Sequence, residues 1–282
     1  MRLFVLTGVM AMALALQAQA FEADHVERLK STGSCENCDL GGASLMGLSL
    51  SGAKLNRTNL RESDLKNIDV TGSDMSSADL RRCNLEKGTL DGVNLENARI
   101  AGADLEKASL RNANLHRADL RDSDLGKTDL RGANLEDADL RNVLMKRADL
   151  RGARLLHAQL GLARLERSDL SEADARRADF TNADMDRVRL LGADLRDADF
   201  SDARLERTNF TGANLKGAVF TGALLRRTIF SDADLTGARG LKQDRLREAC
   251  GNAQTRLPAG LTLKECEMDP EAMIDTAVGP NS

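Results

Sequence analysis

Cysteines are the residues of this chain best suited to chemistry, and four of the five lie near its two ends. Cys35 and Cys38 form a C-x-x-C pair, and Cys250 and Cys266 lie close together in the last part of the chain. Such cysteines can form disulfides, hold zinc as a set of four, or act as a redox pair where C-x-x-C begins a helix. Where the fold places the two pairs decides among these possibilities.

Basic residues form the second candidate site, because from residue 87 a Lys or Arg recurs at every twentieth position. We name this series the basic ladder: Lys87, Lys107, Lys127, Arg147, Arg167, Arg187, Arg207 and Arg227. Lys146 and Arg226 each precede a ladder residue. The ladder could bind an extended polyanion, such as an acidic glycan or lipid head groups. Alternatively, it is a solvated edge compensated by neighbouring acids, here Glu86, Glu106, Glu166, Asp186 and Glu206.

Other reactive residue types are sparse. The chain has 3 His and neither Trp nor Tyr, and its net charge is −4 with 30% charged residues. It shows no nucleophile beside a base, no glycine-rich phosphate loop and no cluster of metal ligands. His116 and His157 are too far apart in the expected fold to share a metal. We therefore expect no catalysis, no cofactor and no metal, and a mixed surface that does not favour nucleic acid.

A five-residue period positions all these residues. A central apolar residue recurs 40 times from Leu40 to Leu235 without insertion, and it is Leu in 29 cases. The residue two places earlier is small in 35 pentads, and the residue between them is Asp or Asn in 25. Residues two apart on a strand face the same way, so the small and central residues point inward. Asp, Asn and Gly then favour a turn. The pattern predicts a β-solenoid.

A second, longer period sets the number of sides, because chemically similar residues recur at every fourth pentad. The basic ladder follows this period, and so do Phe180, Phe200 and Phe220. Residues separated by four pentads should therefore lie one above the other, which makes four pentads per turn. We predict an all-β quadrilateral β-helix of about ten coils, roughly 48 Å long at the usual strand spacing.

These pentads resemble the pentapeptide-repeat family. Ala118-Asp119-Leu120-Arg121-Asp122 and Ala133-Asn134-Leu135-Glu136-Asp137 match its A-(D/N)-L-x-x signature. The resemblance implies a right-handed β-helix. Some members imitate duplex DNA and protect topoisomerases from quinolones, but those are cytoplasmic and markedly acidic. This chain has a basic ladder, and its first 20 residues read as a secretory signal peptide, so DNA mimicry is the least favoured of the functions considered.

The rod decides the cysteine chemistry. The two pairs lie at opposite ends, so cross-pairing and a four-cysteine zinc site are both excluded. We predict the disulfides Cys35–Cys38 and Cys250–Cys266. A redox role for the first pair is disfavoured, because a strand rather than a helix follows it. Cys83 occupies an inward small position and should be a buried thiol.

Caps should close both ends of the solenoid. Residues 23–31 read as a short helix with Val26 and Leu29 inward, and residues 241–249 as a second with Leu241 and Leu246 inward. Three outward positions near the end are apolar, namely Val219, Leu224 and Ile229. We expect the C-terminal segment to fold back over some of them. An interface with another protein is the alternative.

Residues 1–20 read as a secretory signal peptide. Arg2 precedes a short apolar stretch, and Ala18-Gln19-Ala20 is a small-x-small cleavage site. The expected organisation is therefore a signal peptide (1–20), an N-terminal cap (21–37), the solenoid (38–237), a C-terminal cap (238–266) and a flexible tail (267–282). The favoured function is a periplasmic or secreted scaffold, not transmembrane, that binds another protein. Polyanion binding along the ladder is the alternative.

Overall fold

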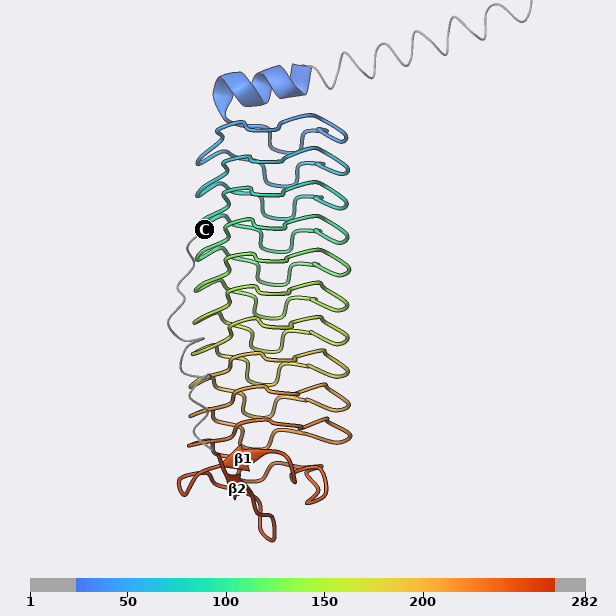
Figure 1. Ribbon diagram of the computed structural model, residues 1–282. Coiled ribbons are helices and arrows are strands. Elements are labelled where there is room, and N and C mark those ends of the chain that lie inside the picture. The colour runs from blue at the N-terminus through green and yellow to red at the C-terminus, as the bar shows by residue number, and fades with distance from the viewer. Residues whose placement is uncertain (1–23, 267–282) are drawn as a thin grey trace, which may run out of the picture.

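The chain forms one stack of similar coils, closed by a different structure at each end (Figure 1). The computed structural model describes residues 24–266, so the expected signal peptide and tail lie outside the described residues. A helix over 24–32 lies across the first coil. At the opposite end β1 (Cys250–Gly251) and β2 (Lys264–Glu265) pair in parallel. Between residues 24 and 266 no helix has the length and apolar character that crossing a bilayer requires.

One turn of the coil takes four pentads. The outward residue of each pentad from Asp39 to Val219 forms a parallel bridge with the residue 20 positions later, as in Asp39↔Asn59 and Asn114↔Asn134. The central residue donates its amide to the next coil, for example from Leu40 N to Asn59 O over 2.8 Å. These bridges confirm the predicted stacking of every fourth pentad. Each side of the coil pairs through a single residue because the chain turns again after each pentad, which explains why so few extended strands appear.

Every central residue from Leu40 to Leu235 points inward and is between 0 and 7% exposed. The small residues line the same core. Where they are Ser or Thr, the hydroxyl donates to a backbone carbonyl of the preceding coil, as Ser63 Oγ does to Leu40 O over 2.8 Å and Thr208 Oγ1 to Met185 O over 2.7 Å. The buried hydroxyls therefore have partners, which removes the cost of burying them.

A tight turn forms each corner of the coil. The amide of the small residue donates to the carbonyl of the preceding central residue, as in Ala103 N to Ile100 O over 3.0 Å. The residue two after each centre has a positive φ, whether it is Gly or not, for example 65° at Gly92 and 58° at Lys87. This left-handed conformation is costly for residues other than Gly. It explains why Gly occupies seven of the ten positions in one corner series, which begins at Gly52.

Leu162 provides a test of this backbone cost, because it has φ 63° and its side chain is 60% exposed. We expect Leu162→Gly to raise the free energy of unfolding by about 0.5–1 kcal/mol, since relief of left-handed strain exceeds the entropy that Gly adds to the unfolded chain. The matched control is Gly192→Ala at φ 64°, where an added Cβ would meet no atom within 4 Å. It should lower stability by about 1 kcal/mol. Urea denaturation measures both, and a less stable Leu162→Gly variant would contradict the argument.

The N-terminal cap is the expected amphipathic helix. Leu29 is fully buried and Val26 packs against the same core. Gly33 follows with φ 65°, and its amide donates to Leu29 O over 2.8 Å. Gly in this conformation ends helices readily because it lacks a Cβ. The helix therefore covers the apolar end of the core and then passes directly into the first coil, whose bridges begin at Ser34.

The C-terminal cap differs from expectation, because residues 243–248 form turns instead of the helix predicted over 241–249. Leu246 is nevertheless buried, at 1% exposure. The reason lies in the last coil, whose amides need acceptors. Arg227 N, Phe230 N and Leu235 N donate to the carbonyls of Glu248, Cys250 and Arg256. A helix would use its carbonyls internally and leave these amides unpaired. The segment therefore continues as an irregular coil.

This segment closes the end of the core and, within the described residues, does not fold back over the apolar outer positions. Leu224 remains 46% exposed. Val219 and Ile229 are half-buried, and Ile229 forms a bridge with Cys250 of the irregular coil. The expected covering of the outer positions is therefore not found at Leu224.

Candidate functional site

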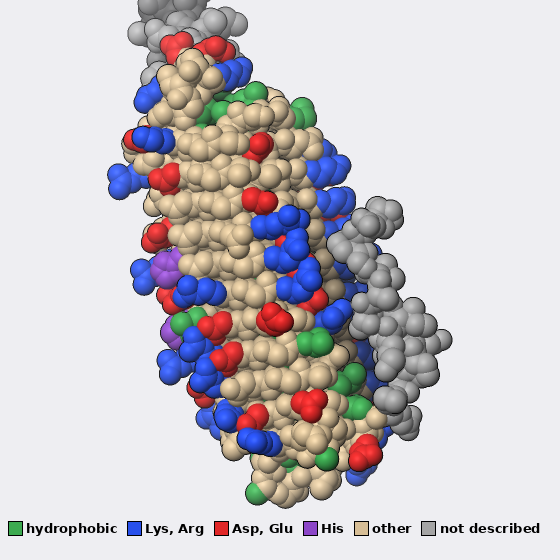
Figure 2. Space-filling view, turned by 90° about the vertical axis from the view of Figure 1, so that its left-hand side faces the viewer, with side chains coloured by type: hydrophobic (Ala, Val, Ile, Leu, Met, Phe, Trp, Pro, Cys, Tyr) green, Lys and Arg blue, Asp and Glu red, His purple; other side chains and the backbone are tan. Residues whose placement is uncertain are grey.

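The basic ladder lies along one corner of the rod. All eight members occupy the left-handed turn position, with φ between 56° and 64°. Their side chains therefore leave the coil at equivalent points, about 4.8 Å apart along the axis. Figure 2 shows Lys and Arg side chains gathered with Asp and Glu on one face of the rod. The four-sided coil brings the predicted ladder together as expected.

Acids of the preceding position compensate most of the ladder. We name Glu86, Glu106, Glu166, Asp186 and Glu206 the acidic column. Lys87 and Lys107 each bind the acid directly before them, at 3.2 and 3.0 Å. Lys127, which follows a Gly, reaches back to Glu106 over 3.3 Å. These contacts lower the pKa of Glu106, chiefly through hydrogen bonds from Lys107 and Lys127.

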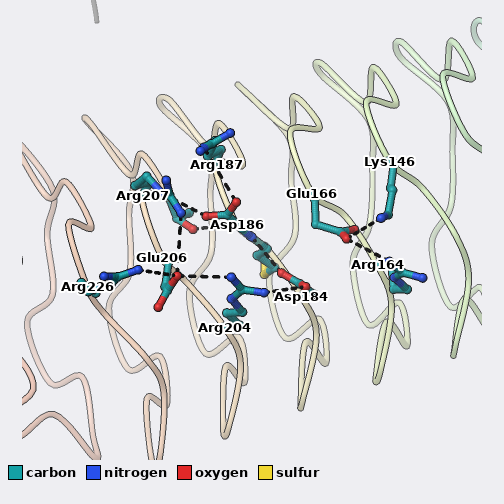
Figure 3. Close-up of polar contacts among 12 residues, drawn as sticks. Lys146, Arg164, Glu166, Asp184, Asp186, Arg187, Arg204, Glu206, Arg207 and Arg226 are labelled. Atoms are coloured by element: carbon teal, nitrogen blue, oxygen red, sulfur yellow. Dashed lines mark hydrogen bonds and ion pairs between the residues drawn. The ribbon is translucent and has the colours of Figure 1, made fainter.

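The C-terminal part of the ladder belongs to a network of shared ion pairs (Figure 3). Asp186 lies 3.8 Å from Arg187 and 3.2 Å from Arg207. Glu206 lies 3.3 Å from both Arg204 and Arg226. A hydrogen bond from Arg226 is the main cause of the lowered pKa of Glu206. Each carboxylate thus serves at least two cations, which favours the interpretation of this stretch as a compensated surface.

Three ladder residues differ from the rest. Arg147, Arg167 and Arg227 form no ion pair or side-chain hydrogen bond with any residue between 24 and 266. Two neighbours that the sequence also favoured for anion binding are paired, since Lys146 binds Glu166 over 2.8 Å and Arg226 binds Glu206. Within the described structure, the available positive charge of the ladder is therefore concentrated at three positions.

A shallow groove of about 390 Å³ opens beside one of them. It lies where Gly126 leaves a gap in the row of side chains between Glu106 and Lys146. Its lining combines four bases, two acids and one apolar residue: Lys127, Lys146, Arg147, Arg164, Glu106, Asp124 and Leu144, in addition to Gly126. The sequence pattern placed Arg147 correctly but gave no sign of the groove, which depends on side chains that meet only between successive coils.

Asp–Arg pairs within one pentad, which we call Asp–Arg clamps, are a second feature that the repeat pattern did not predict. In seven pentads the Asp before the centre and the Arg after it form two parallel hydrogen bonds. The pairs are Asp79–Arg81, Asp119–Arg121, Asp129–Arg131, Asp139–Arg141, Asp149–Arg151, Asp174–Arg176 and Asp194–Arg196. The recurring D-x-R triplet was the available signal. These clamps neutralise charge on three of the four walls.

One clamp makes stability depend on pH. Burial alone would raise the pKa of Asp129, but hydrogen bonds from Arg131 and Arg111 lower it from 3.8 to about 2. A carboxyl group whose pKa is lower in the folded protein than in the unfolded chain stabilises the fold at pH values above its unfolded pKa. This stabilisation is lost as the pH falls towards the folded-state pKa. We expect Asp129→Asn to cost about 1–2 kcal/mol at pH 7, because water partly screens the pair, and progressively less below pH 4. Urea titrations from pH 7 to 2 measure this difference, and a cost that stays constant with pH would refute it.

The cysteines form the predicted pairs. Cys35–Cys38 and Cys250–Cys266 are both disulfides, and Cys83 is a buried free thiol whose pKa is raised, mainly by burial. His157 Nδ1 lies 3.4 Å from Asp137, and His116 Nδ1 lies 3.0 Å from Glu136 O. Among residues 24–266 no three His, Cys, Asp or Glu side chains are placed to hold a metal.

Comparison with known families matches nearly the whole coil. The pentapeptide-repeat model is found in 8 copies, which together span residues 34–126 and 128–239. The chain belongs to the pentapeptide-repeat family. Membership implies the right-handed hand of the quadrilateral β-helix, which agrees with the four-pentad coil. No curated protein matches the chain at a significant level.

Several solved pentapeptide-repeat structures are similar to this chain. HetL, from the cyanobacterium Nostoc sp. strain PCC 7120 and involved in heterocyst differentiation regulation, is 28% identical with a TM-score of 0.31; the match covers 82% of this chain and 97% of HetL. A trypsin-treated variant of QnrB1, a plasmid-mediated fluoroquinolone resistance protein, is 17% identical with a TM-score of 0.40, covering 86% and 100%. With TM-scores this low, family membership rests on the repeat match.

Proposed function

We propose that this pentapeptide-repeat protein is an exported, non-enzymatic scaffold that binds another protein through its outer walls. The observation that carries the proposal is the filled core, in which all 40 central side chains are buried. An interior packed in this way has no room for a substrate, so recognition falls to the surface. The two disulfides support export, because such bonds persist in oxidising compartments.

The apolar end of the rod is the best candidate for the contact. Val219, Leu224 and Ile229 lie in three successive pentads and face outward on three different walls of the last coil. These residues occupy outward positions that are usually Asp or Asn in this chain. Leu224 is 46% exposed, and burying its apolar surface against a partner would be favourable. Arg245 of the C-terminal segment donates to Gly222 O over 3.0 Å, yet Leu224 stays exposed. A protein partner would bury this side chain.

Affinity capture from the exported fraction tests the proposal. The wild-type rod should retain a specific protein, and Leu224→Lys should reduce its recovery at least tenfold, because a buried unpaired charge is costly at an interface. Leu162→Lys is the matched control, since Leu162 is also exposed, at 60%, but lies at a corner of another coil. Equal loss in both variants, or no partner enriched by the wild-type rod, would contradict the proposal. Recovery of the protein from the cytoplasm alone would contradict export.

A further inference from the structure

The wall beside the basic ladder lacks the Asp–Arg clamps found on the other three walls. We name this wall A, after its outward residues: Ser44, Asp64, Asn84, Asp104, Asp124, Leu144, Arg164, Asp184, Arg204 and Leu224. None of the seven Asp–Arg clamps in the described structure lies on wall A. Its arginines pair with the acidic column, and Arg204 also pairs with Asp184 over 3.3 Å. That column is interrupted over two consecutive coils, where Gly126 and Lys146 replace acids.

The groove lies at this interruption. Lys127 shares Glu106 of the preceding coil with Lys107 and lies 3.3 Å from it. Lys146 and Arg164 share Glu166 at 2.8 and 3.3 Å. Arg147 forms no ion pair within residues 24–266. Two acids line the groove, Glu106 and Asp124, and Asp124 accepts a hydrogen bond from Gly126 N over 2.8 Å. With four bases against two acids, the lining still carries an excess of positive side chains. This groove is therefore the one part of the described ladder where four cations surround an open space.

We propose that this groove binds a carboxylate or sulfate group of a linear acidic glycan. The free guanidinium of Arg147 can donate two parallel hydrogen bonds to such a group, and Lys127 and Lys146 add point charges on either side. Leu144 offers an apolar contact to the face of a sugar ring. Arg167, one coil away and also without an acid partner among the described residues, continues the site along the axis. A linear chain lying along the corner would meet both arginines.

Nucleic acid and membrane fit this surface less well. Single-stranded nucleic acid is bound largely by stacking bases on aromatic side chains. The chain has neither Trp nor Tyr, and the five Phe of the described coil are at most 2% exposed. A membrane presents a plane of head groups, whereas the unpaired arginines follow one corner. The exposed Leu224 of wall A lies four coils from Leu144, about 19 Å away.

Two pairs of variants test the site. Gly126→Glu restores the missing acid, and Gly126→Gln fills the same space without charge. The φ of Gly126 is not in the left-handed region, but an added Cβ would lie 3.1 Å from Asp124 Oδ1, so the Asp124 side chain must shift by a few tenths of an ångström. Both variants require the same shift, so they differ in charge. Arg147→Gln removes the free guanidinium, and Arg187→Gln is its control, since Arg187 already pairs with Asp186. Melting temperatures of all four variants establish that each is folded.

Binding is measured with polygalacturonate and dextran sulfate, with neutral dextran as the blank, in about 50 mM NaCl, where screening is weak. The wild-type protein should bind at least one acidic glycan, and salt should weaken this binding. Arg147→Gln should weaken it about tenfold, and Arg187→Gln less than twofold. Gly126→Glu should bind at least fivefold more weakly than Gly126→Gln.

Several results would overturn the proposal. Binding of neither glycan above the dextran blank would exclude the site. Equal losses for Arg147→Gln and Arg187→Gln would show diffuse charge attraction instead of a groove, and so would equal affinities of Gly126→Glu and Gly126→Gln. Equal or tighter binding to phosphatidylglycerol vesicles or to a single-stranded oligonucleotide would assign the site to another ligand class. Because Leu224 lies outside the groove, loss of glycan binding leaves the capture experiment unaffected.

Discussion

Phe210→Ala is expected to destabilise the protein by about 3–5 kcal/mol, because it removes one ring from the cluster of five stacked phenylalanines in the core. Phe210 is fully buried. Its ring centroid lies 5.3 Å from that of Phe230 in a parallel stack, and 5.7 and 6.4 Å from Phe200 and Phe220 in edge-to-face contact. Backbone hydrogen bonds between coils hold the preceding and following coils in place, so they cannot easily move into the cavity.

Phe210→Leu is the matched control, since Leu occupies 29 of the 40 equivalent positions. It should cost about 1 kcal/mol, because it keeps most of the volume. Urea denaturation followed by circular dichroism compares the two variants. If Phe210→Ala lowers the free energy of unfolding by less than about 1.5 kcal/mol, the neighbouring coils must collapse into the cavity. That result would contradict the rigid stacking described above.

Loss of the C-terminal disulfide is the second large effect. The double variant Cys250→Ser with Cys266→Ser should lower the free energy of unfolding by about 3 kcal/mol, because the bond closes a loop with a sequence separation of 16. The bond also holds β2 beside β1, where Cys250 faces Lys264. Without it the irregular coil should open first, since end repeats of a solenoid depend on one neighbour only.

Hydrogen exchange locates this opening. The amide of Phe230, which donates to Cys250 O over 2.8 Å, should lose protection, while that of Leu135 should keep it. Cys35→Ser with Cys38→Ser is the control at the other end. It should cost about 2 kcal/mol, because its loop has a sequence separation of only 3. Uniform loss of protection along the rod in the C-terminal variant would show that the cap does not open independently.

The regular features of the molecule could be predicted because they are local and repeated. A small residue, a polar residue and a Leu at fixed spacing give a short strand, and the turn that follows depends on the same pentad. The disulfides followed from the length of the rod, which excluded cross-pairing. The N-terminal helix was readable because Val26 and Leu29 share one face. In each case a few neighbouring residues carry the whole signal.

The irregular features could not be predicted in this way. The spacing of Leu241 and Leu246 favours a helix in the C-terminal segment. The amides of the last coil, however, donate to carbonyls of this segment, which a helix would use internally. Hydrogen bonding to the last coil therefore outweighed the local helix preference. The pairing of the ladder is similar. Arg147 and Arg187 occupy equivalent positions, but only Arg187 has an acid beside it that it can use. The difference lies in Lys146 and Asp186, not in the period.

The amino-acid sequence alone thus determined the square coil, its filled core, the disulfide partners and the alignment of the basic residues along one corner, because one five-residue rule governs them all. Only the tertiary structure decided which of those basic residues stay free, where a groove opens and how the last coil is closed. A long Lys or Arg side chain can pair with any of several nearby acids. The unpaired backbone amides at the end of the solenoid can hydrogen-bond to any segment that supplies carbonyls. Both outcomes depend on groups that meet only after the chain has coiled.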